Sequence, residues 1–225
     1  STCCCSEYRH GPPLTIERLR PFLSCDAICY NFITGMEFSL ETFCAARSAS
    51  SGLALMDVHS LTLGVDGAHR RYWRVPPEWE RWVGCADVVQ LNEEEGSLLG
   101  GEALVSEEST HRFGERVLSA GPKALLITRA GRGSQALYRG GSGQVVVEDF
   151  EAYRAGDVCD ETGCGDVFLM GFTWGYLESS DVGEASRLAN RVAGINCCLR
   201  GIEGVPQLGA FFNAAGGGTS PGLGT

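Results

Sequence analysis

The sequence lacks several features that mark common classes of protein. It has no apolar run long enough to span a bilayer, and its first nine residues lack the basic start and apolar middle of a secretion signal. Lys and Arg number only 18 against 28 Asp and Glu, which gives a formal net charge of −10, whereas nucleic-acid binding requires clustered cations. We therefore expect a cytoplasmic protein with no nucleic acid and no membrane among its partners.

Cysteine motifs for metals are absent as well. The 11 cysteines include no C-x-x-C pair, so they indicate neither a zinc site nor a disulfide framework. Free cysteine in a reducing compartment usually behaves as a small buried hydrophobic residue. We expect most of these cysteines to be buried.

The P-loop G-x-x-x-x-G-K-[ST] is also missing, which excludes the commonest nucleoside-triphosphatase fold. From about residue 26, short apolar runs alternate with amphipathic stretches, a pattern typical of βαβ units around a mostly parallel sheet. The pattern predicts strands at 27–33, 53–58, 87–91 and 124–128, and helices near 40–47, 77–83 and 107–119.

After residue 128 the pattern changes. Alternation at 135–138 and 144–147 predicts antiparallel strands joined by a glycine-rich turn, and two helices, 165–177 and 182–199, follow. The first 25 residues contain no clear strand and no glycine-rich opening. We expect an irregular remnant at 1–25 with a missing N-terminal segment, a catalytic domain at 26–213 and a disordered glycine-rich tail at 214–225; an irregular arm on a complete domain is the alternative.

The segment from Asp160 to Asp166, D-E-T-G-C-G-D, precedes an apolar helical pattern. The N–H groups and dipole at a helix N-terminus favour an anion, and glycines let the backbone approach a phosphate closely. A phosphate would repel the Asp166 carboxylate, so the presence of a carboxylate at this position has to be explained. General base catalysis explains it, because a carboxylate there can take the proton of a hydroxyl that attacks a γ-phosphoryl group. A plain helix cap, with Asp166 complementing the dipole, is the alternative.

These residues resemble a known family. Asp160–Asp166 looks like the D-T-T-G-A-G-D signature of ribokinase-like sugar kinases, the phosphofructokinase B family, with departures at Glu161 and Cys164. Asn92–Glu95 is similar to the family's N-x-x-E, and Thr128–Gly133 resembles its T-x-G-x-x-G with alanine at the first glycine. Three motifs in the family's order are far more specific than one, and the resemblance spans residues 26 to 206.

The resemblance implies a ribokinase-like three-layer α/β fold with a mostly parallel central sheet, without the family's N-terminal strands and β lid. It implies ATP-dependent phosphorylation of a hydroxyl on a sugar or nucleoside-like small molecule. Many relatives pair through the lid that this sequence does not show, so the oligomeric state stays open, with a homodimer as one alternative. The resemblance implies that Gly163, Cys164 and Gly165 form an anion hole and that Asp166 is the base. It implies that Asn92 and Glu95 organise Mg²⁺ and the phosphates through water, and that Thr128, Gly131, Gly133 and Asn190 contact the nucleotide. It also implies a monovalent cation, K⁺, beside Asp160 and Thr162.

Elementary chemistry agrees with part of this. Mg²⁺ prefers oxygen ligands and commonly sits between one carboxylate and substrate phosphates, and Glu95 follows an apolar strand. Glu93–Glu95 is equally an acidic first helical turn. His59 ends another strand near the expected cleft, but a lone histidine there is more often structural, so we assign it no role. Glu161 adds negative charge beside the phosphate site and costs little only if it points outward.

Three other functions are alternatives to the kinase. Gly131–Ala136 matches the dinucleotide fingerprint G-x-G-x-x-A, yet the residues that follow alternate like a strand where the fingerprint needs a helix. Cys164 at a helix N-terminus would suit a thiol nucleophile. A non-catalytic nucleotide-binding protein or an inactive kinase fragment is the third.

Overall fold

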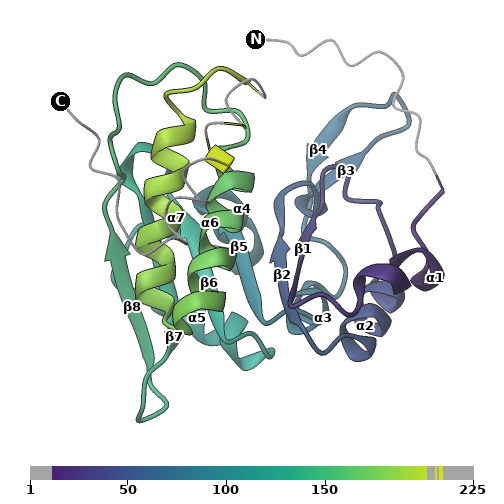
Figure 1. The fold of residues 1–225 in the computed structure, drawn as a ribbon. Helices are drawn as coiled ribbons and strands as arrows, with labels where there is room; N and C mark the ends of the chain where they lie inside the picture. Colours follow the sequence, from purple (N-terminus) through teal and green to yellow (C-terminus); the bar gives the residue numbers. More distant parts are fainter. Residues whose placement is uncertain (1–11, 202–205, 207, 210–225) are drawn as a thin grey trace. The chain divides into compact units, whose positions relative to one another are not determined.

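The structure is a computed structural model that describes residues 12–201, 206, 208 and 209 (Figure 1). The chain divides into two compact units. The first comprises the residues up to 129 together with 135–149, and the second comprises 130–134 and the residues from 150 onward. Among the described residues, no helix combines the length and apolar character needed to cross a membrane.

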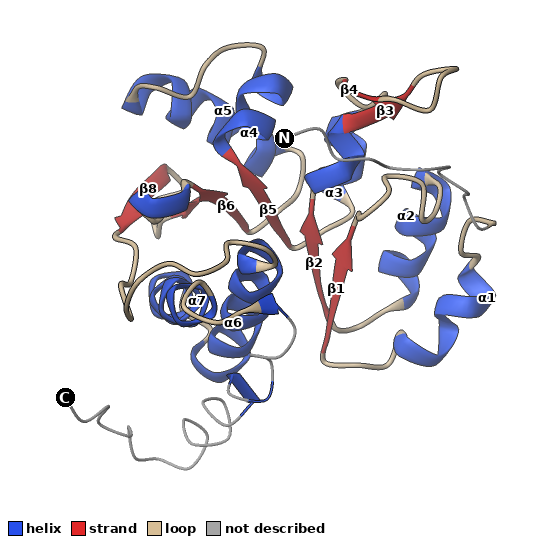
Figure 2. Ribbon diagram, turned by 90° about the horizontal axis from the view of Figure 1, so that it is seen from above, coloured by secondary structure: helices blue, strands red, loops and turns tan. Residues whose placement is uncertain are grey.

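A six-stranded sheet organises the first unit. Its strands follow the order β1-β2-β5-β6-β7-β8, and β1, β2, β5 and β6 pair in parallel. Figure 2 shows β1 and β2 side by side and pointing the same way. A short turn joins β7 to β8, so these two run antiparallel, as predicted. The strands are β1 Ala27–Asn31, β2 Leu53–Asp57, β5 Val88–Asn92, β6 Ala124–Thr128, β7 Ser134–Arg139 and β8 Val145–Phe150.

The predicted helices of this unit are present and begin at recognisable caps. Ser39 accepts a hydrogen bond from the Thr42 N–H at the start of α2, and Ser106 with Ser109 forms a capping box at the start of α5. The predicted helices are α2 Leu40–Ala49, α3 Trp79–Gly84 and α5 Glu107–Ser119. A further helix, α4 Glu93–Gly100, begins at the residues for which an acidic first helical turn was the alternative.

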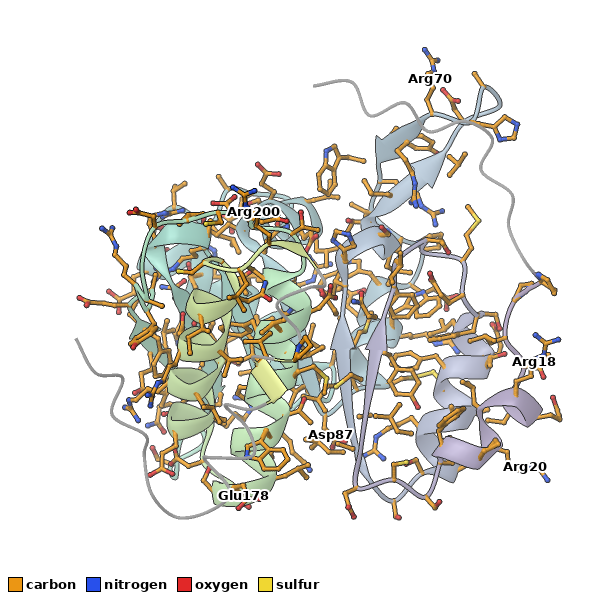
Figure 3. The ribbon with its side chains drawn as sticks, turned by 45° about the horizontal axis from the view of Figure 1, so that its top comes forward. Arg18, Arg20, Arg70, Asp87, Glu178 and Arg200 are labelled. Carbon is orange, nitrogen blue, oxygen red and sulfur yellow. A yellow bond between two sulfur atoms is a disulfide. The ribbon has the colours of Figure 1, made fainter. Side chains whose placement is uncertain are left out.

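Several small elements were not predicted. A one-turn helix, α1 (Ile16–Leu19), and a 3₁₀ turn at Arg20–Phe22 lie in the segment expected to be irregular. Strands β3 (Leu63–Val65) and β4 (Arg71–Trp73) form a separate antiparallel pair, with Arg70 near its tip (Figure 3). Strands of three residues are too short to produce a recognisable alternation.

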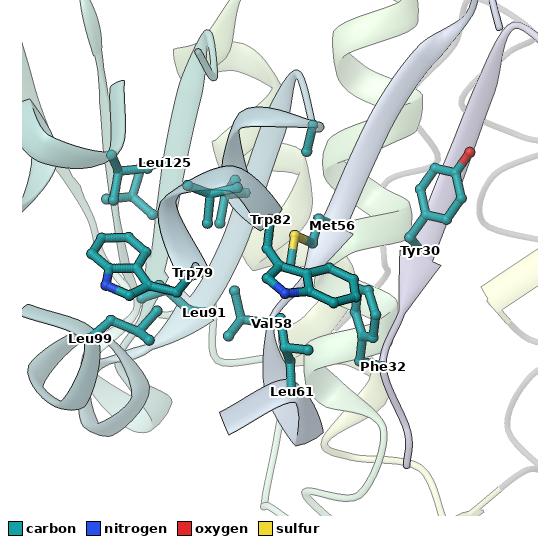
Figure 4. Packing of buried hydrophobic residues seen from close by; sticks show 14 of the residues in the cluster. Tyr30, Phe32, Met56, Val58, Leu61, Trp79, Trp82, Leu91, Leu99 and Leu125 are labelled. Carbon is teal, nitrogen blue, oxygen red and sulfur yellow. The ribbon is translucent and has the colours of Figure 1, made fainter. Parts of the chain in front are cut away.

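Aromatic side chains fill one side of the sheet's core (Figure 4). The Phe32 ring lies 5.4 Å from the Trp82 ring, edge to face, and Phe43 stacks on Trp82 at 6.0 Å. Phe32 and Phe43 are fully buried. Burial of such a side chain contributes about 1.5–3 kcal/mol, so this cluster fixes α2 and α3 against the segment that directly follows β1.

A charged cluster closes the sheet at the start of β5. The Asp87 carboxylate accepts a hydrogen bond from the Ala54 N–H at 3.0 Å and pairs with Arg47 at 2.9 Å and Lys123 at 3.1 Å (Figure 3). Burial alone would raise the pKa of Asp87, but the Ala54 N–H and the two cations hold the pKa below its ordinary value of 3.8. The cluster lies at the end of the parallel strands opposite their carboxyl ends.

Two helices dominate the second unit and pack along their lengths (Figure 1). They are α6 (Cys164–Ser179) and α7 (Val182–Asn196), the latter capped by Asp181. A side chain at Gly175 would meet the Ala185 Cα at 2.9 Å. Small residues at the contact therefore allow the two helix backbones to approach closely.

The prediction that most cysteines are buried is wrong for the part of the chain that the structure describes. None of the cysteines there is buried: Cys25 and Cys159 are exposed, and the others are intermediate. Cys44 in α2 forms a disulfide with Cys85 at the end of α3, which no spacing motif indicated. The expected disordered tail, 214–225, lies outside the described residues.

Candidate functional site

The first group of predicted site residues lies where β5 and β6 end. Asn92 caps α4: its Oδ1 accepts from the Glu95 N–H at 2.9 Å, and Glu95 Oε2 accepts from the Asn92 N–H at 2.8 Å. Thr128 is the register partner of Asn92 on β6. The N-x-x-E motif is therefore a capping box, and it brings Asn92, Glu95 and Thr128 together at the carboxyl edge of the sheet.

Glu95 has a neighbour to which we assigned no role. The His59 Nδ1 lies 3.6 Å from Glu95 Oε1, the carboxylate oxygen that the capping box does not use. The Glu95 side chain is 4% exposed and that of His59 is 58% exposed. His59 also adopts a φ of 22°, which is uncommon for a non-glycine residue. The sequence signal for this contact was only a histidine at a strand end.

The second group is the turn before α6. Gly163 is the N-cap residue, with a φ of 77° in the left-handed region that glycine adopts without strain. Cys164 is the first residue of α6, and Asp166 lies in its first turn with an exposed side chain. The first N–H groups of an α-helix have no partner within the helix and lie at its positive end. The predicted helix N-terminus is thus present, with a carboxylate at its mouth.

The rest of this turn is held by its own hydrogen bonds. Asp160 accepts from the Thr162 N–H at 2.9 Å and from the Gly201 N–H at 3.3 Å. The Thr162 backbone and side chain and the Gly201 N–H hold the pKa of Asp160 below its ordinary value. These contacts account for the position of the carboxylate, and a cation beside Asp160 and Thr162 stays a prediction. Glu161 is exposed, which is the condition under which its charge was expected to cost little beside a phosphate.

The T-x-G-x-x-G segment shows why glycines recur in it. Ala130 has a φ of 48°, in the left-handed region, at the position where the family carries glycine. Gly133 has a φ of 87°, and a Cβ there would lie 2.0 Å from the Phe150 carbonyl oxygen. A Cβ at Gly131 would meet nothing within 4 Å, so its backbone is open to a ligand. Strand β7 follows directly, which removes the helix that a dinucleotide fingerprint needs.

Asn190 is buried and already has partners. Its side-chain amide donates to Ser134 Oγ at 2.7 Å and to the Ser186 carbonyl oxygen at 2.9 Å. These bonds tie α7 to the first residue of β7. Contact with an adenine stays a prediction.

The predicted site residues therefore fall into two groups. Asn92, Glu95 and Thr128 belong to the first unit; Gly131, Gly133, the turn at 160–166 and Asn190 belong to the second. No set of three or more His, Cys, Asp or Glu side chains among the described residues is arranged to hold a metal. A magnesium ion bound mainly by nucleotide phosphates needs no such set. Glu95 Oε1 takes no part in the capping box and faces His59 Nδ1, and contact of Glu95 with Mg²⁺ through water stays a prediction.

Comparison with known proteins gives the same family as the motifs. Residues 67–206 match the model of the pfkB family of carbohydrate kinases. The chain is 33% identical over 128 residues to ribokinase of Bacillus subtilis (strain 168), covering 57% of this chain and 39% of that protein. It therefore spans well under two thirds of that relative's length.

Solved structures agree on the fold. Arabidopsis thaliana ribokinase, complexed with ribose and ATP, superposes with a TM-score of 0.66 at 17% identity, over 88% of this chain and 60% of that one. Aminoimidazole riboside kinase from Salmonella enterica superposes with a TM-score of 0.62 at 19% identity, over 88% of this chain and 66% of that one. At such identities these structures establish the ribokinase-like α/β fold alone. With the three ordered motifs and the family match over more than half of its length, the chain belongs to the pfkB family of carbohydrate kinases.

Proposed function

We propose that this chain carries the nucleotide-binding and catalytic part of an ATP-dependent kinase that phosphorylates a hydroxyl of a sugar or related metabolite. One observation carries the proposal: the Asp166 carboxylate is exposed in the first turn of α6, directly after the left-handed Gly163. A helix N-terminus favours a phosphate, and an accessible carboxylate beside it suits a general base. The family match and the matched ribokinase bound to ribose and ATP support this reaction class.

In the proposed reaction, Asp166 takes the proton of the acceptor hydroxyl while that oxygen attacks the γ-phosphorus of ATP and ADP leaves. The backbone at Gly163, Cys164 and Gly165 stabilises the negative charge that develops on the transferred group. Bound Mg²⁺ would neutralise phosphate charge, with Asn92 and Glu95 holding it through water.

Backbone and side-chain groups of the following residues are the ones we propose for contact with the nucleotide. We propose contacts from Thr128, from the open backbone of Gly131 and from Asn190. K⁺ beside Asp160, a homodimer and a cytoplasmic location stay predictions.

A panel of acceptors tests the proposal. The chain is incubated with ATP, Mg²⁺ and, in turn, pentoses, hexoses, cyclic polyols and nucleosides, and acceptor-dependent release of ADP is measured beside ATP binding by calorimetry. We expect ADP release with at least one class of acceptor. ATP binding without turnover of any acceptor would favour the non-catalytic alternative, and absence of ATP binding would contradict both.

A further inference from the structure

Two cysteine thiols meet at the turn that begins α6. The Cys164 Sγ lies 2.6 Å from the Sγ of Cys197, the residue that caps the end of α7. A bonded pair of sulfurs lies about 2.0–2.1 Å apart, so a bond would form with a movement of about half an ångström. Asn196 keeps the pair in place, because its side-chain amide donates to Cys164 Sγ at 3.3 Å and to the Thr162 carbonyl oxygen at 3.4 Å.

We propose that Cys164 and Cys197 form a reversible disulfide when the protein meets a hydroperoxide, which makes this pair an oxidation site at the start of α6. Neither residue takes part in the Cys44–Cys85 disulfide. Both are free and partly accessible, so a small oxidant can reach them.

The two thiols have different roles in the reaction. Burial, and then the neighbouring Cys164, raise the pKa of Cys197 to about 12, so Cys197 stays protonated and is not the first nucleophile. Cys164 lies at the positive end of the α6 dipole, a position that favours negative charge.

The chemistry balances in two steps. The Cys164 sulfur attacks one oxygen of the hydroperoxide, the O–O bond breaks, an alcohol or water leaves, and a sulfenic acid remains on Cys164. The Cys197 sulfur then attacks the Cys164 sulfur, the S–O bond breaks, and the oxygen leaves as water with the Cys197 proton. In sum, two thiols lose two electrons and two protons, and the hydroperoxide is reduced to an alcohol and water.

The consequence for catalysis rests on the proposed function. The bond would anchor the first residue of α6 to the end of α7 and shift the backbone around Gly163 and Gly165. Because a misplacement of about 1 Å can cost about a hundredfold in rate, we expect the cross-linked form to lose about tenfold or more in kcat. A dithiol should restore the activity.

Peptide mapping after graded hydroperoxide treatment tests the bond itself and needs no activity. Asp160 and Glu161 separate Cys159 from Cys164, so cleavage after acidic residues places these two cysteines in different peptides. We expect a cross-linked peptide that contains Cys164 and Cys197 and has lost two hydrogen atoms. The exposed Cys25 and Cys159 serve as internal references. If both references are oxidised while Cys164 and Cys197 stay reduced, the proposal is wrong.

Matched variants identify the partner, since Cys197 and Cys198 are adjacent. Cys198→Ala should still form the cross-link, whereas Cys197→Ala should instead accumulate sulfenic acid at Cys164, trapped with a dimedone reagent. A cross-link that survives in Cys197→Ala would overturn the assignment. Unchanged kcat in fully cross-linked protein would overturn the regulatory step. A reduced chain that phosphorylates no acceptor yet still forms the bond would contradict the proposed function and leave the thiol pair supported.

Discussion

Removing the Asp87 carboxylate should destabilise the first unit, by an amount that the structure allows to be worked out. The carboxylate accepts a hydrogen bond from the buried Ala54 N–H, and leaving such a donor unpaired costs about 1–3 kcal/mol. Arg47 and Lys123 are 33% and 60% exposed, so the loss of each ion pair costs under about 1 kcal/mol. We therefore expect Asp87→Ala to lower the free energy of unfolding by about 3 kcal/mol. Asp87→Asn keeps an acceptor for Ala54 and should cost about 1 kcal/mol.

Urea denaturation followed by tryptophan fluorescence measures this loss, since Trp79 and Trp82 are buried in the same unit. Glu115→Gln is the control, because Glu115 forms a surface ion pair with Arg139 at 3.1 Å and such pairs contribute about 0–1 kcal/mol. If Asp87→Ala loses no more stability than Glu115→Gln, the reasoning about the buried N–H is wrong.

The same substitution makes a prediction about pH. The pKa of Asp87 is lower in the folded protein than its ordinary value of 3.8. A group with a lowered folded pKa contributes stability above its unfolded pKa, and that contribution is lost as pH falls through the folded pKa. The difference in stability between the parent chain and Asp87→Asn should therefore be constant near neutral pH and shrink below pH 3.8. A difference that grows on acidification would refute the assignment.

Three further changes test the fold. The Cys44–Cys85 bond closes a separation of 41 residues, so its replacement by two alanines should cost about 2–4 kcal/mol in urea denaturation; an unchanged midpoint would show that the bond does not constrain the chain. Gly133→Ala places a Cβ 2.0 Å from the Phe150 carbonyl oxygen and should lower the free energy of unfolding by about 2 kcal/mol or more in the same assay. Equal stability of the variant and the parent chain would disprove this close approach. Ala130→Gly relieves a φ of 48° and should gain about 0.5 kcal/mol after the entropic cost of glycine, whereas a clear loss would count against the strain.

Much of the fold was predictable because burial repeats along the chain. Two elements have the predicted bounds: strand β6, from Ala124 to Thr128, and helix α5, from Glu107 to Ser119. A continuous apolar run is typical of a buried strand, and a strong amphipathic repeat is typical of a helix, so each pattern predicts one type of element. The β3–β4 pair escaped prediction because three residues carry too little pattern. The Cys44–Cys85 bond escaped because it joins two helices through tertiary packing, which sequence spacing does not encode.

The site was predictable where its motifs are local. A glycine with a positive φ before a helix is encoded in a few adjacent residues, as at Gly163, and so is the capping box of Asn92 and Glu95. The contacts of His59 with Glu95 and of Cys197 with Cys164 join residues more than 30 positions apart. Such contacts depend on how strands and helices pack, and no local pattern marks them. The roles in ATP binding rest on the family resemblance and stay proposals.

The most direct test of the central claim compares kcat for Asp166→Asn with that of the parent chain on an acceptor found in the panel. Asp181→Asn is the matched control, because Asp181 caps α7 and asparagine caps a helix as well as aspartate does. We predict that Asp166→Asn lowers kcat at least about a hundredfold, as expected for the loss of a general base, while ATP binding is retained and Asp181→Asn keeps its kcat. Undiminished phosphoryl transfer by Asp166→Asn would contradict the account.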